Sequence, residues 1–470
     1  MKKLSWLVLT IYLILLFFTR FYNLPNTAQF AEDESGFLVR AHQIYKEKKI
    51  TLVGQVNQFG TKVFSSLTIY LLLPFAILGK FDPISIFYGA AFLGVITVLV
   101  MLYLANIINK RLTFLTAVLL LLSYPLVRTG RWAWNPNFIP LWISLGLIFY
   151  LQKKKFSYFL AGIFFGLSVH QHYYAIFACF AFIFLISVKE LVRKHFKEFI
   201  LINFGFILML IPFIVFDLRH PPGIFILGAS KQAQVITIPA IFKNFFPYAF
   251  DTLKYHTQNP LLAVILAATI AYLLFLDLAK NKKALLYFTP VLFQIIFVSA
   301  VDAYFPHYFF AIIPFFFIWL IYPRQKIGKA LSRIAVFCFI IGGVLSLVPQ
   351  LTISPVEPNL KTFKKIDSLL EEQILKNDLK NVNIAVLASP DPSTQAQKYR
   401  NLLLIPNNLS VMTHDEYFSN DLLFVISTAS ETQLRKDPAS ELNNFRNGLI
   451  MDSWQIEPGS WQVYLFGKNI

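Results

Sequence analysis

Charged residues and cysteines are both scarce in this 470-residue chain. Only 14% of the residues are charged while 56% are hydrophobic, which excludes an ordinary soluble globular protein of this length. The two cysteines, Cys179 and Cys338, both fall inside apolar runs, so neither a disulfide framework nor a thiolate metal site is expected. We therefore predict a polytopic α-helical membrane protein.

Acidic residues are also few, 25 against 42 Lys and Arg, which leaves a formal net charge of +17. In a soluble domain this excess would suggest nucleic acid, but here the basic residues form short clusters between apolar runs, as topology signals do. No nucleic-acid partner is expected, and we predict that all the clusters face the cytoplasm. They are Lys2/Lys3, Lys110/Arg111, Lys153–Lys155, Lys189–Lys197, Lys280–Lys283 and Arg324–Lys329.

About eleven apolar runs are predicted to span the membrane. They lie at residues 4–20, 84–108, 112–127, 137–151, 156–169, 172–188, 199–216, 259–278, 285–302, 305–322 and 329–349. A further run, Val63–Gly79, contains Pro74 and would place the later basic clusters on the wrong side if it crossed, so we expect a re-entrant or interfacial segment. The first run lacks a small-residue cleavage site and is predicted to be a signal anchor in the cell (plasma or inner) membrane.

The composition changes at residue 351. Residues 1–350 contain the apolar runs, whereas residues 351–470 contain a helical pattern at 361–377 and strand-like runs at 383–389, 421–428 and 461–467. We predict two parts, a transmembrane catalytic module and a small α/β domain. With an odd number of spans after a cytoplasmic N-terminus, the α/β domain would be extracytoplasmic.

Polar residues are distributed unequally between the two predicted sides. The predicted span interiors contain no clear Asp, Glu, Lys or Arg, which disfavours an ion-coupled transporter because such proteins usually need ionisable groups at mid-membrane depth. Of the eight histidines, only His195 falls in a predicted cytoplasmic loop. An active site is therefore expected on the outer face.

Three adjacent acids, Glu32, Asp33 and Glu34, follow the first apolar run and precede an amphipathic helical pattern. In one interpretation Asp33 or Ser35 caps that helix. In the other, Asp33 is a general base at the membrane interface, and Glu34 orients it or shares a divalent metal with it. Both interpretations stay open at this stage.

The stretch "RTGRWAWNPN" supplies Arg128 and Arg131, fixed positive charges suited to a phosphate. Arginines at an outer membrane end run against the usual charge bias, which favours a function for them. Trp132 and Trp134 fit an interfacial aromatic belt equally well.

Histidines mark two further outer segments. In "HQHYY", His170 and His172 could bind a phosphate or sugar; a zinc site lacks a third ligand fixed by spacing, so the metal is unassigned. In "DAYFPHYFFAIIP", His307 and Tyr308 could hold a headgroup or anchor the following helix in the interface.

The stretch "FDLRHPP" directly follows a predicted span and offers Arg219 and His220 as substrate-binding residues. A structural ion pair between Asp217 and Arg219 is the alternative.

Taken in order, these motifs resemble the GT-C glycosyltransferases. The acids after the first span, "RWAWNPN" at 131–137, "GIFFGLSVH" at 162–170, "PFIVFDLRH" at 212–220 and "PHYFFAIIP" at 306–314 carry the resemblance. The branch most similar contains the protein O-mannosyltransferases and the lipid A aminoarabinose transferase. The resemblance covers residues 1–350 and implies a polytopic GT-C fold.

The resemblance also implies a reaction. GT-C enzymes of this branch move a sugar from a polyprenyl-phosphate donor on the extracytoplasmic face, with Asp33 activating the acceptor and Arg131, Arg219 and His307 as candidates to hold the donor phosphate. Where the family often has a second acid, this chain has Asn135 and Asn137. That departure puts a two-acid or metal-dependent mechanism in doubt, and a divalent metal stays a possible cofactor.

The implied chemistry is a direct, inverting displacement that transfers a hexosyl or pentosyl group to a glycan, lipid or protein acceptor in the bilayer. A surface polysaccharide ligase or polymerase, and a lipid-linked sugar flippase or transporter, are the alternatives.

Overall fold

The computed structural model describes residues 2–56, 63–220, 238–301, 304–391, 395–405, 409–457 and 459–468. The chain divides into two compact units. The helical unit comprises Met1–Tyr22, Thr51–Leu71 and Tyr88–Leu351, and the sheet unit comprises Asn23–Ile50, Leu72–Phe87 and Thr352–Ile470. The sheet unit thus includes the segment with the three adjacent acids as well as the predicted C-terminal domain.

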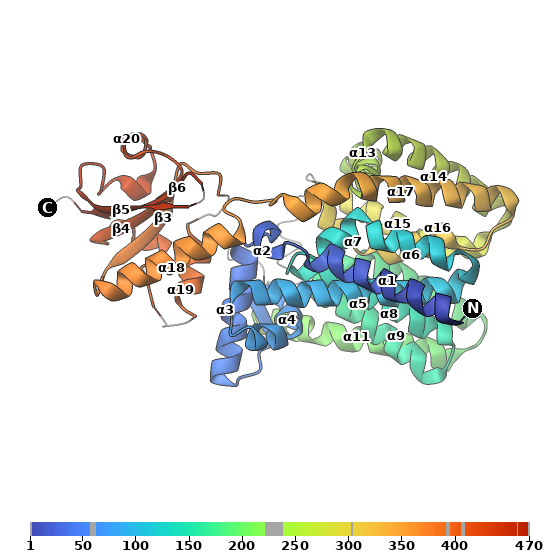
Figure 1. The fold of residues 1–470 in the computed structure, drawn as a ribbon. Helices are drawn as coiled ribbons and strands as arrows, with labels where there is room; N and C mark the ends of the chain where they lie inside the picture. Colours follow the sequence, from blue (N-terminus) through green and yellow to red (C-terminus); the bar gives the residue numbers. More distant parts are fainter. Residues whose placement is uncertain are drawn as a thin grey trace. The chain divides into compact units, whose positions relative to one another are not determined.

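Apolar helices build the helical unit (Figure 1). Its long helices are α1 (Lys2–Phe21), α5 (Pro83–Asn109), α8 (Ile139–Gln152), α9 (Lys155–Gln171), α10 (Ala175–Val192), α11 (Phe196–Arg219), α13 (Ile238–Thr257), α14 (Pro260–Lys280), α15 (Lys282–Val298) and α17 (Lys326–Thr352). Shorter helices are α4 (Leu67–Leu78), η1 (Lys110–Leu112), α6 (Thr113–Leu122), α7 (Tyr124–Thr129), η2 (Asn135–Phe138), η3 (Pro306–Phe309) and α16 (Ile312–Ile321). A two-stranded antiparallel ribbon of β1 (Val53–Val56) and β2 (Val63–Ser65) completes it.

Five helical segments among the described residues are long and apolar enough to cross a membrane: Pro83–Leu122, Ala175–Val192, Phe196–Arg219, Pro260–Lys280 and Lys326–Thr352. The segment Pro83–Leu122 contains two helices, α5 and α6, with the turn η1 between them. The chain runs back along α5 after this turn, so that Gly130, which follows α7, lies against Gly94 of α5. A Cβ atom on Gly94 would lie 2.6 Å from the Cα atom of Gly130, so this approach requires glycine. A multi-pass membrane protein is thus supported, while the number of about eleven spans stays a prediction.

The segment Val63–Gly79 forms β2 and then α4, a helix of 12 residues that contains Pro74. At 1.5 Å per residue such a helix reaches about 18 Å, well short of a ~30 Å hydrocarbon core. Its length agrees with the expectation that this segment does not cross the membrane by itself.

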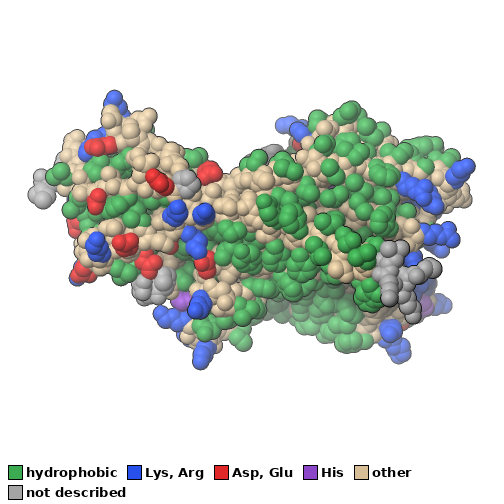
Figure 2. Space-filling view, in the orientation of Figure 1, with side chains coloured by type: hydrophobic (Ala, Val, Ile, Leu, Met, Phe, Trp, Pro, Cys, Tyr) green, Lys and Arg blue, Asp and Glu red, His purple; other side chains and the backbone are tan. Residues whose placement is uncertain are grey.

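Lys and Arg gather at one end of the helical unit, where α1 begins, whereas its flank is hydrophobic (Figure 2). The basic clusters follow α5, separate α8 from α9, separate α10 from α11 and precede α17. Residues at the other ends of these helices, such as those joining α9 to α10, therefore lie away from the basic end.

The structure changes two sequence predictions. The run at 305–322 is not one continuous α-helix: it begins with η3 and becomes α-helical only at Ile312. Helix α13 was not predicted, because its apolar residues are interrupted by Lys243, Asn244 and Asp251. It packs against α14, α15 and α7.

Two buried charges at helix ends qualify the expectation that the spans lack charge. Asp277, near the end of α14, pairs with the Arg324 guanidinium at 2.7 Å and accepts a hydrogen bond from the Trp319 indole. Arg20, fully buried at the end of α1, donates to the carbonyls of Leu120 and Leu121. Both groups have structural partners, as buried charges require.

The C-terminal part of the sheet unit contains helix α18 (Leu360–Lys376) and a four-stranded sheet in the order β3–β4–β6–β5. The strands are β3 (Val382–Val386), β4 (Leu422–Ser427), β5 (Ile450–Ile456) and β6 (Trp461–Gly467); β3 and β4 are parallel and the other pairs antiparallel. The predicted helix and three strands are confirmed. The edge strand β5 was missed because several of its side chains are exposed and polar.

Short helices complete the sheet unit: α2 (Leu24–Thr27), α3 (Glu32–Glu47), α19 (Gln397–Leu403), η4 (His414–Glu416), α20 (Glu431–Leu434) and η5 (Ser440–Leu442). Helix α3 is the amphipathic helix expected after the acids. It packs against α19, and the Phe30 ring that precedes it lies 4.8 Å from the Phe363 ring of α18. The acidic segment is therefore part of one core with the C-terminal sheet.

Candidate functional site

Aromatic and histidine rings from three separate segments meet in the helical unit, at the ends of the helices opposite the basic clusters. The Trp132 and Trp134 rings stack with centroids 4.3 Å apart, and Trp134 meets the His307 ring at 4.6 Å. His307 in turn lies 5.1 Å from His172, whose ring is 5.5 Å from Tyr308. We call Trp132, Trp134, His172, Tyr173, Tyr174, His307 and Tyr308 the ring cluster.

Prolines and buried amides position these rings. Pro136 and Pro306 each start a short 3-10 turn, η2 and η3, that directs the preceding chain across the helix ends. The Asn135 amide donates to the carbonyl of Gln171 at 2.6 Å, which ties η2 to the end of α9. Asn137 donates to the carbonyl of Trp132 at 2.7 Å. These two asparagines therefore brace the ring cluster.

A third amide, Gln294 of α15, holds η3. Its nitrogen donates to the carbonyl of Tyr308 at 2.5 Å, and its oxygen accepts from the backbone N–H of Ala178 in α10. The sequence analysis did not select Gln294. Its signal was an amide inside an otherwise apolar predicted span, where each polar group needs a partner.

His307 and the three tyrosines of the ring cluster are uncharged at neutral pH, and a cation lies beside them. His307 lies in η3, ahead of α16, and burial lowers its pKa to about 3, so the imidazole is uncharged at neutral pH. Burial raises the pKa of Tyr173 to about 12 and raises the pKa values of Tyr174 and Tyr308 as well. These groups can exchange hydrogen bonds with a polar ligand without carrying charge.

Arg128 supplies the cation. Its guanidinium lies over the Trp132 ring, 5.3 Å from the ring centroid, and its side chain is partly exposed. A guanidinium held in this way presents fixed donors beside the ring cluster, where a phosphate oxygen could accept them.

Arg131 has a different setting, because it is buried and donates from Nη1 to the carbonyls of Thr19 and Arg20, at 3.3 and 3.2 Å. These are the terminal carbonyls of α1, which need such donors. Burial lowers the pKa of Arg131 to about 10, which leaves it charged at neutral pH. The contacts support a structural role, and its predicted phosphate contact stays a prediction.

His170 is separated from its neighbour His172. Its Nδ1 is hydrogen-bonded to Ser65 Oγ at 2.8 Å, and its Nε2 to the carbonyl of Met209 at 2.6 Å. Both ring nitrogens thus join α9 to β2 and α11. These bonds oppose the idea that His170 and His172 ligate one metal, and they favour a bracing role for His170 over its predicted substrate contact.

Arg219 and His220 end helix α11, and both are exposed. The His220 ring stacks on Phe216 at 4.1 Å rather than on the ring cluster. Asp217 is buried. The predicted substrate contacts of Arg219 and His220 stay predictions, and the motif continues into residues outside the described ranges.

The acids start helix α3, but not through the predicted caps. Ala31 is the N-cap residue. The backbone N–H of Ala31 donates a hydrogen bond to the Glu34 carboxylate at 2.8 Å, as in a capping box. The expectation that Asp33 or Ser35 caps the helix was wrong; Asp33 lies inside the first turn, and Ser35 Oγ donates to the carbonyl of Glu32. Glu34 is buried, whereas Asp33 is partly exposed.

Metal ligands do not cluster in the part of the chain that the structure describes. There, no three or more His, Cys, Asp or Glu side chains are arranged to hold a metal ion. The possible divalent metal of the sequence analysis therefore has no assigned ligand set.

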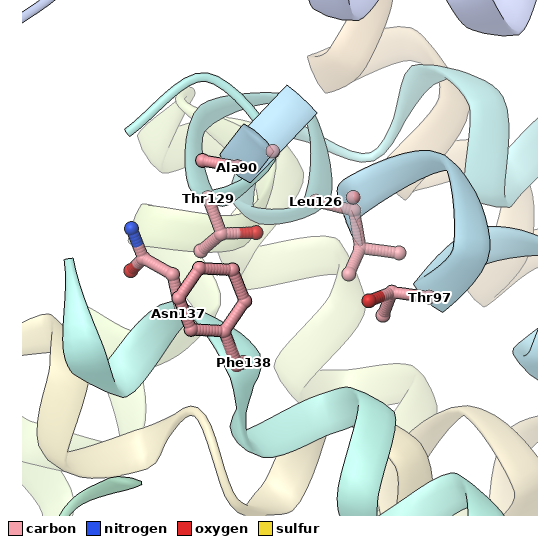
Figure 3. A pocket seen from close by; sticks show the side chains of 8 residues that line it. Ala90, Thr97, Leu126, Thr129, Asn137 and Phe138 are labelled. Atoms are coloured by element: carbon pink, nitrogen blue, oxygen red, sulfur yellow. The ribbon is translucent and has the colours of Figure 1, made fainter. Parts of the chain in front are cut away.

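A narrow crevice lies at the contact of α5 with α7 and η2, lined by Ala90, Gly94, Thr97, Leu126, Thr129, Gly130, Asn137 and Phe138. Figure 3 shows the Phe138 ring beside the Thr129 side chain at its centre. The crevice follows from the close approach of Gly94 and Gly130, directly before the Arg131–Asn137 motif.

No family model and no curated protein sequence matches this chain. Solved structures do match, among them ArnT from Cupriavidus metallidurans bound to undecaprenyl phosphate and the same protein in the apo state. Both have a TM-score of 0.58 at 10% identity, covering 98% and 99% of this chain and 98% of the ArnT chain. This chain has the fold of ArnT. The ArnT fold agrees with the resemblance drawn from the motifs, since ArnT is an aminoarabinose transferase of the GT-C superfamily.

Proposed function

We propose that this protein is a membrane glycosyltransferase that moves a single sugar from a polyprenyl-phosphate donor to an acceptor on the extracytoplasmic face. The observation that carries the proposal is the ArnT fold, which extends over 98% of both chains and is known with undecaprenyl phosphate bound. The order of the sequence motifs supports the same class independently.

The ring cluster is the proposed donor site. Sugars bind well against aromatic faces edged with hydrogen-bonding groups, and the Trp132–Trp134 stack beside His307 offers both. Arg128 is the proposed phosphate contact, since a guanidinium forms bidentate hydrogen bonds with phosphate oxygens. Tyr308 completes the set of neutral hydrogen-bonding groups, and the His172 ring, 5.1 Å from His307, adds two further ring nitrogens.

Asp33 is the proposed general base. It would accept the proton of the acceptor hydroxyl while that oxygen forms a bond to the anomeric carbon and the bond from that carbon to the phosphate oxygen breaks. Polyprenyl phosphate leaves with the bonding electrons, and cationic donors stabilise its charge. Attack from the opposite face inverts the anomeric centre. Glu34, whose carboxylate caps α3, would orient Asp33 by fixing the first turn.

The membrane position follows from the distribution of basic residues. If the Lys and Arg clusters face the cytoplasm, as the charge bias predicts, the ring cluster at the opposite helix ends faces the extracytoplasmic side. The donor's prenyl chain would then lie in the bilayer beside the apolar helices. The sugar would be a hexose or pentose, and the acceptor a glycan, lipid or protein.

The test supplies the purified protein, in nanodiscs, with undecaprenyl-phosphate-linked hexose or aminopentose and membrane extracts as acceptors. We expect mass spectrometry to detect acceptors heavier by one sugar residue, with free undecaprenyl phosphate released in equal amount. Addition of preassembled chains would instead identify a ligase or polymerase. Movement of the donor across vesicles without bond formation would identify a flippase, and either result contradicts the proposal.

A further inference from the structure

The C-terminal part of the sheet unit contacts the acidic turn of α3 directly. The Asn401 amide on α19 donates a hydrogen bond to Ser35 Oγ at 2.9 Å. Lys398 lies one helical turn before Asn401, and residues three apart share a helix face. Ser35 and Glu32 are likewise three apart on α3. Lys398 therefore faces the Glu32–Ser35 turn.

Lys398 is buried to an unusual degree for a lysine, with 2% of its side chain exposed. Its ammonium pairs with Asp391 Oδ1 at 2.9 Å, and the Tyr399 hydroxyl donates to the other oxygen of Asp391 at 3.2 Å. The rings of Phe363 and Tyr399 each lie 5.4 Å from the ammonium nitrogen. Phe363 also contacts Phe30, so these rings connect Lys398 to the chain just before α3.

The acids of α3 act electrostatically on this ammonium. Desolvation lowers the pKa of Lys398, while Asp391, and after it Glu32 and Glu34, raise it. A buried cation next to one carboxylate partner and a turn rich in carboxylates attracts that turn. The sheet unit thus places a positive charge where the acids would otherwise repel one another.

We propose that Lys398 is a positioning residue for the acidic turn of α3, which it holds so that Asp33 keeps a productive orientation. The inference rests on the proposed function insofar as Asp33 is the base. It assigns a role to the C-terminal domain, whose sequence does not choose among selecting the acceptor, binding glycan and covering the site: the domain holds helix α3 in place.

If the Lys398–Asp391 ion pair only stabilises the fold, a different experimental result is expected. Removing one partner of a buried pair destabilises strongly, whereas replacing both by apolar residues is often neutral or stabilising. The double variant Lys398→Met/Asp391→Leu removes the pair without leaving a buried charge. If the pair only stabilises the fold, this variant regains both stability and activity; if Lys398 positions α3, stability returns and activity does not.

The experiment compares wild type, Lys398→Arg, Lys398→Met, the double variant and Lys364→Met in nanodiscs. Lys364→Met is the matched control, because Lys364 forms an ion pair with Asp82 in the same unit, at 2.5 Å, and lies on α18 rather than on α19. Three quantities are measured: Tm, the kcat and KM of transfer, and hydrogen exchange of the peptide covering residues 30–40. Hydrogen exchange does not require activity, so it tests the positioning even if the wild type transfers none of the supplied sugars, a result that would defeat the proposed function alone.

For the double variant we expect a Tm that recovers most of the loss seen in Lys398→Met, the remainder reflecting the Tyr399 hydroxyl that loses its acceptor. We also expect a kcat lower by about tenfold with the donor KM unchanged, and exchange in residues 30–40 faster by about tenfold. Lys398→Arg should keep most of the kcat, and Lys364→Met should match wild type in all three measurements. Wild-type exchange across residues 30–40 in the double variant would overturn the proposal. So would a kcat that recovers together with its Tm.

Discussion

The His307 ring meets the indole of Trp134 edge to face, with centroids 4.6 Å apart. The two residues come from separate motifs, one before η2 and one in η3, and the amides of Asn135 and Gln294 hold those turns in place. This contact joins the arginine–tryptophan motif to the histidine motif in one ring cluster. The donor predictions below depend on it.

Trp134→Ala should weaken donor binding more than it slows transfer. The indole offers an aromatic face for a sugar, and loss of such a contact raises the donor KM by about tenfold while kcat changes less. Steady-state kinetics with a polyprenyl-phosphate sugar measure both quantities. Trp6→Ala is the matched control, because Trp6 is exposed at the basic end of α1; equal effects of the two changes would contradict a donor site at the ring cluster.

His307 should act as a neutral group. Burial places its pKa at about 3, below the ordinary 6.5, so the imidazole is unprotonated between pH 5 and pH 9. His307→Gln should lower kcat/KM yet leave the shape of its pH dependence unchanged over that range. A pH inflection near 6.5 that disappears in His307→Gln would show that His307 titrates during catalysis.

The lowered pKa of His307 also makes the stability of the folded protein depend on pH. The unfolded chain takes up a proton near pH 6.5 while the folded chain resists it until about pH 3, so stability falls as the pH drops through this window. The Tm of His307→Gln should therefore fall less than the Tm of wild type when the pH is lowered from 7 to 5. Thermal unfolding in nanodiscs at the two pH values measures this difference.

Substitutions of Arg128 and Arg131, the two arginines of "RTGRWAWNPN", should affect different properties of the protein. Arg131→Ala removes the donors to the last carbonyls of α1 and should lower Tm, since an unsatisfied buried acceptor costs about 1–3 kcal/mol. Arg128→Ala should leave Tm near wild type and raise the donor KM. Parallel Tm and KM measurements on both variants test this, and a raised KM with normal Tm in Arg131→Ala would reverse the assignment.

Asp33→Asn should abolish transfer while the protein still folds and inserts, because an amide cannot accept the acceptor proton. Glu47→Gln makes the same acid-to-amide change at the exposed end of α3 and should be neutral. Glu34→Gln changes a capping carboxylate, so a Tm loss corresponding to about 1 kcal/mol is expected. Transfer by Asp33→Asn at more than about a tenth of the wild-type rate would remove Asp33 as the base.

Much of the architecture could be predicted from local patterns. The apolar runs, the amphipathic helix after the acids, helix α18 and strands β3, β4 and β6 each show their period or burial within a few consecutive residues. Helix α13 and strand β5 could not be found this way, because one mixes polar groups into its apolar face and the other is a sheet edge.

The sequence by itself determined a polytopic membrane protein, because hydrophobicity acts through composition. Its charge bias predicted basic loops on one side and histidines, tryptophans and acids on the other. Only the tertiary structure decided which of the candidate site residues lie close together. It grouped Trp134, His172 and His307, and it gave His170 and Arg131 backbone partners. It also packed the acids of α3 against Lys398 of the C-terminal domain. Such roles depend on which buried donor meets which acceptor, and residues hundreds of positions apart carry no local signal of that.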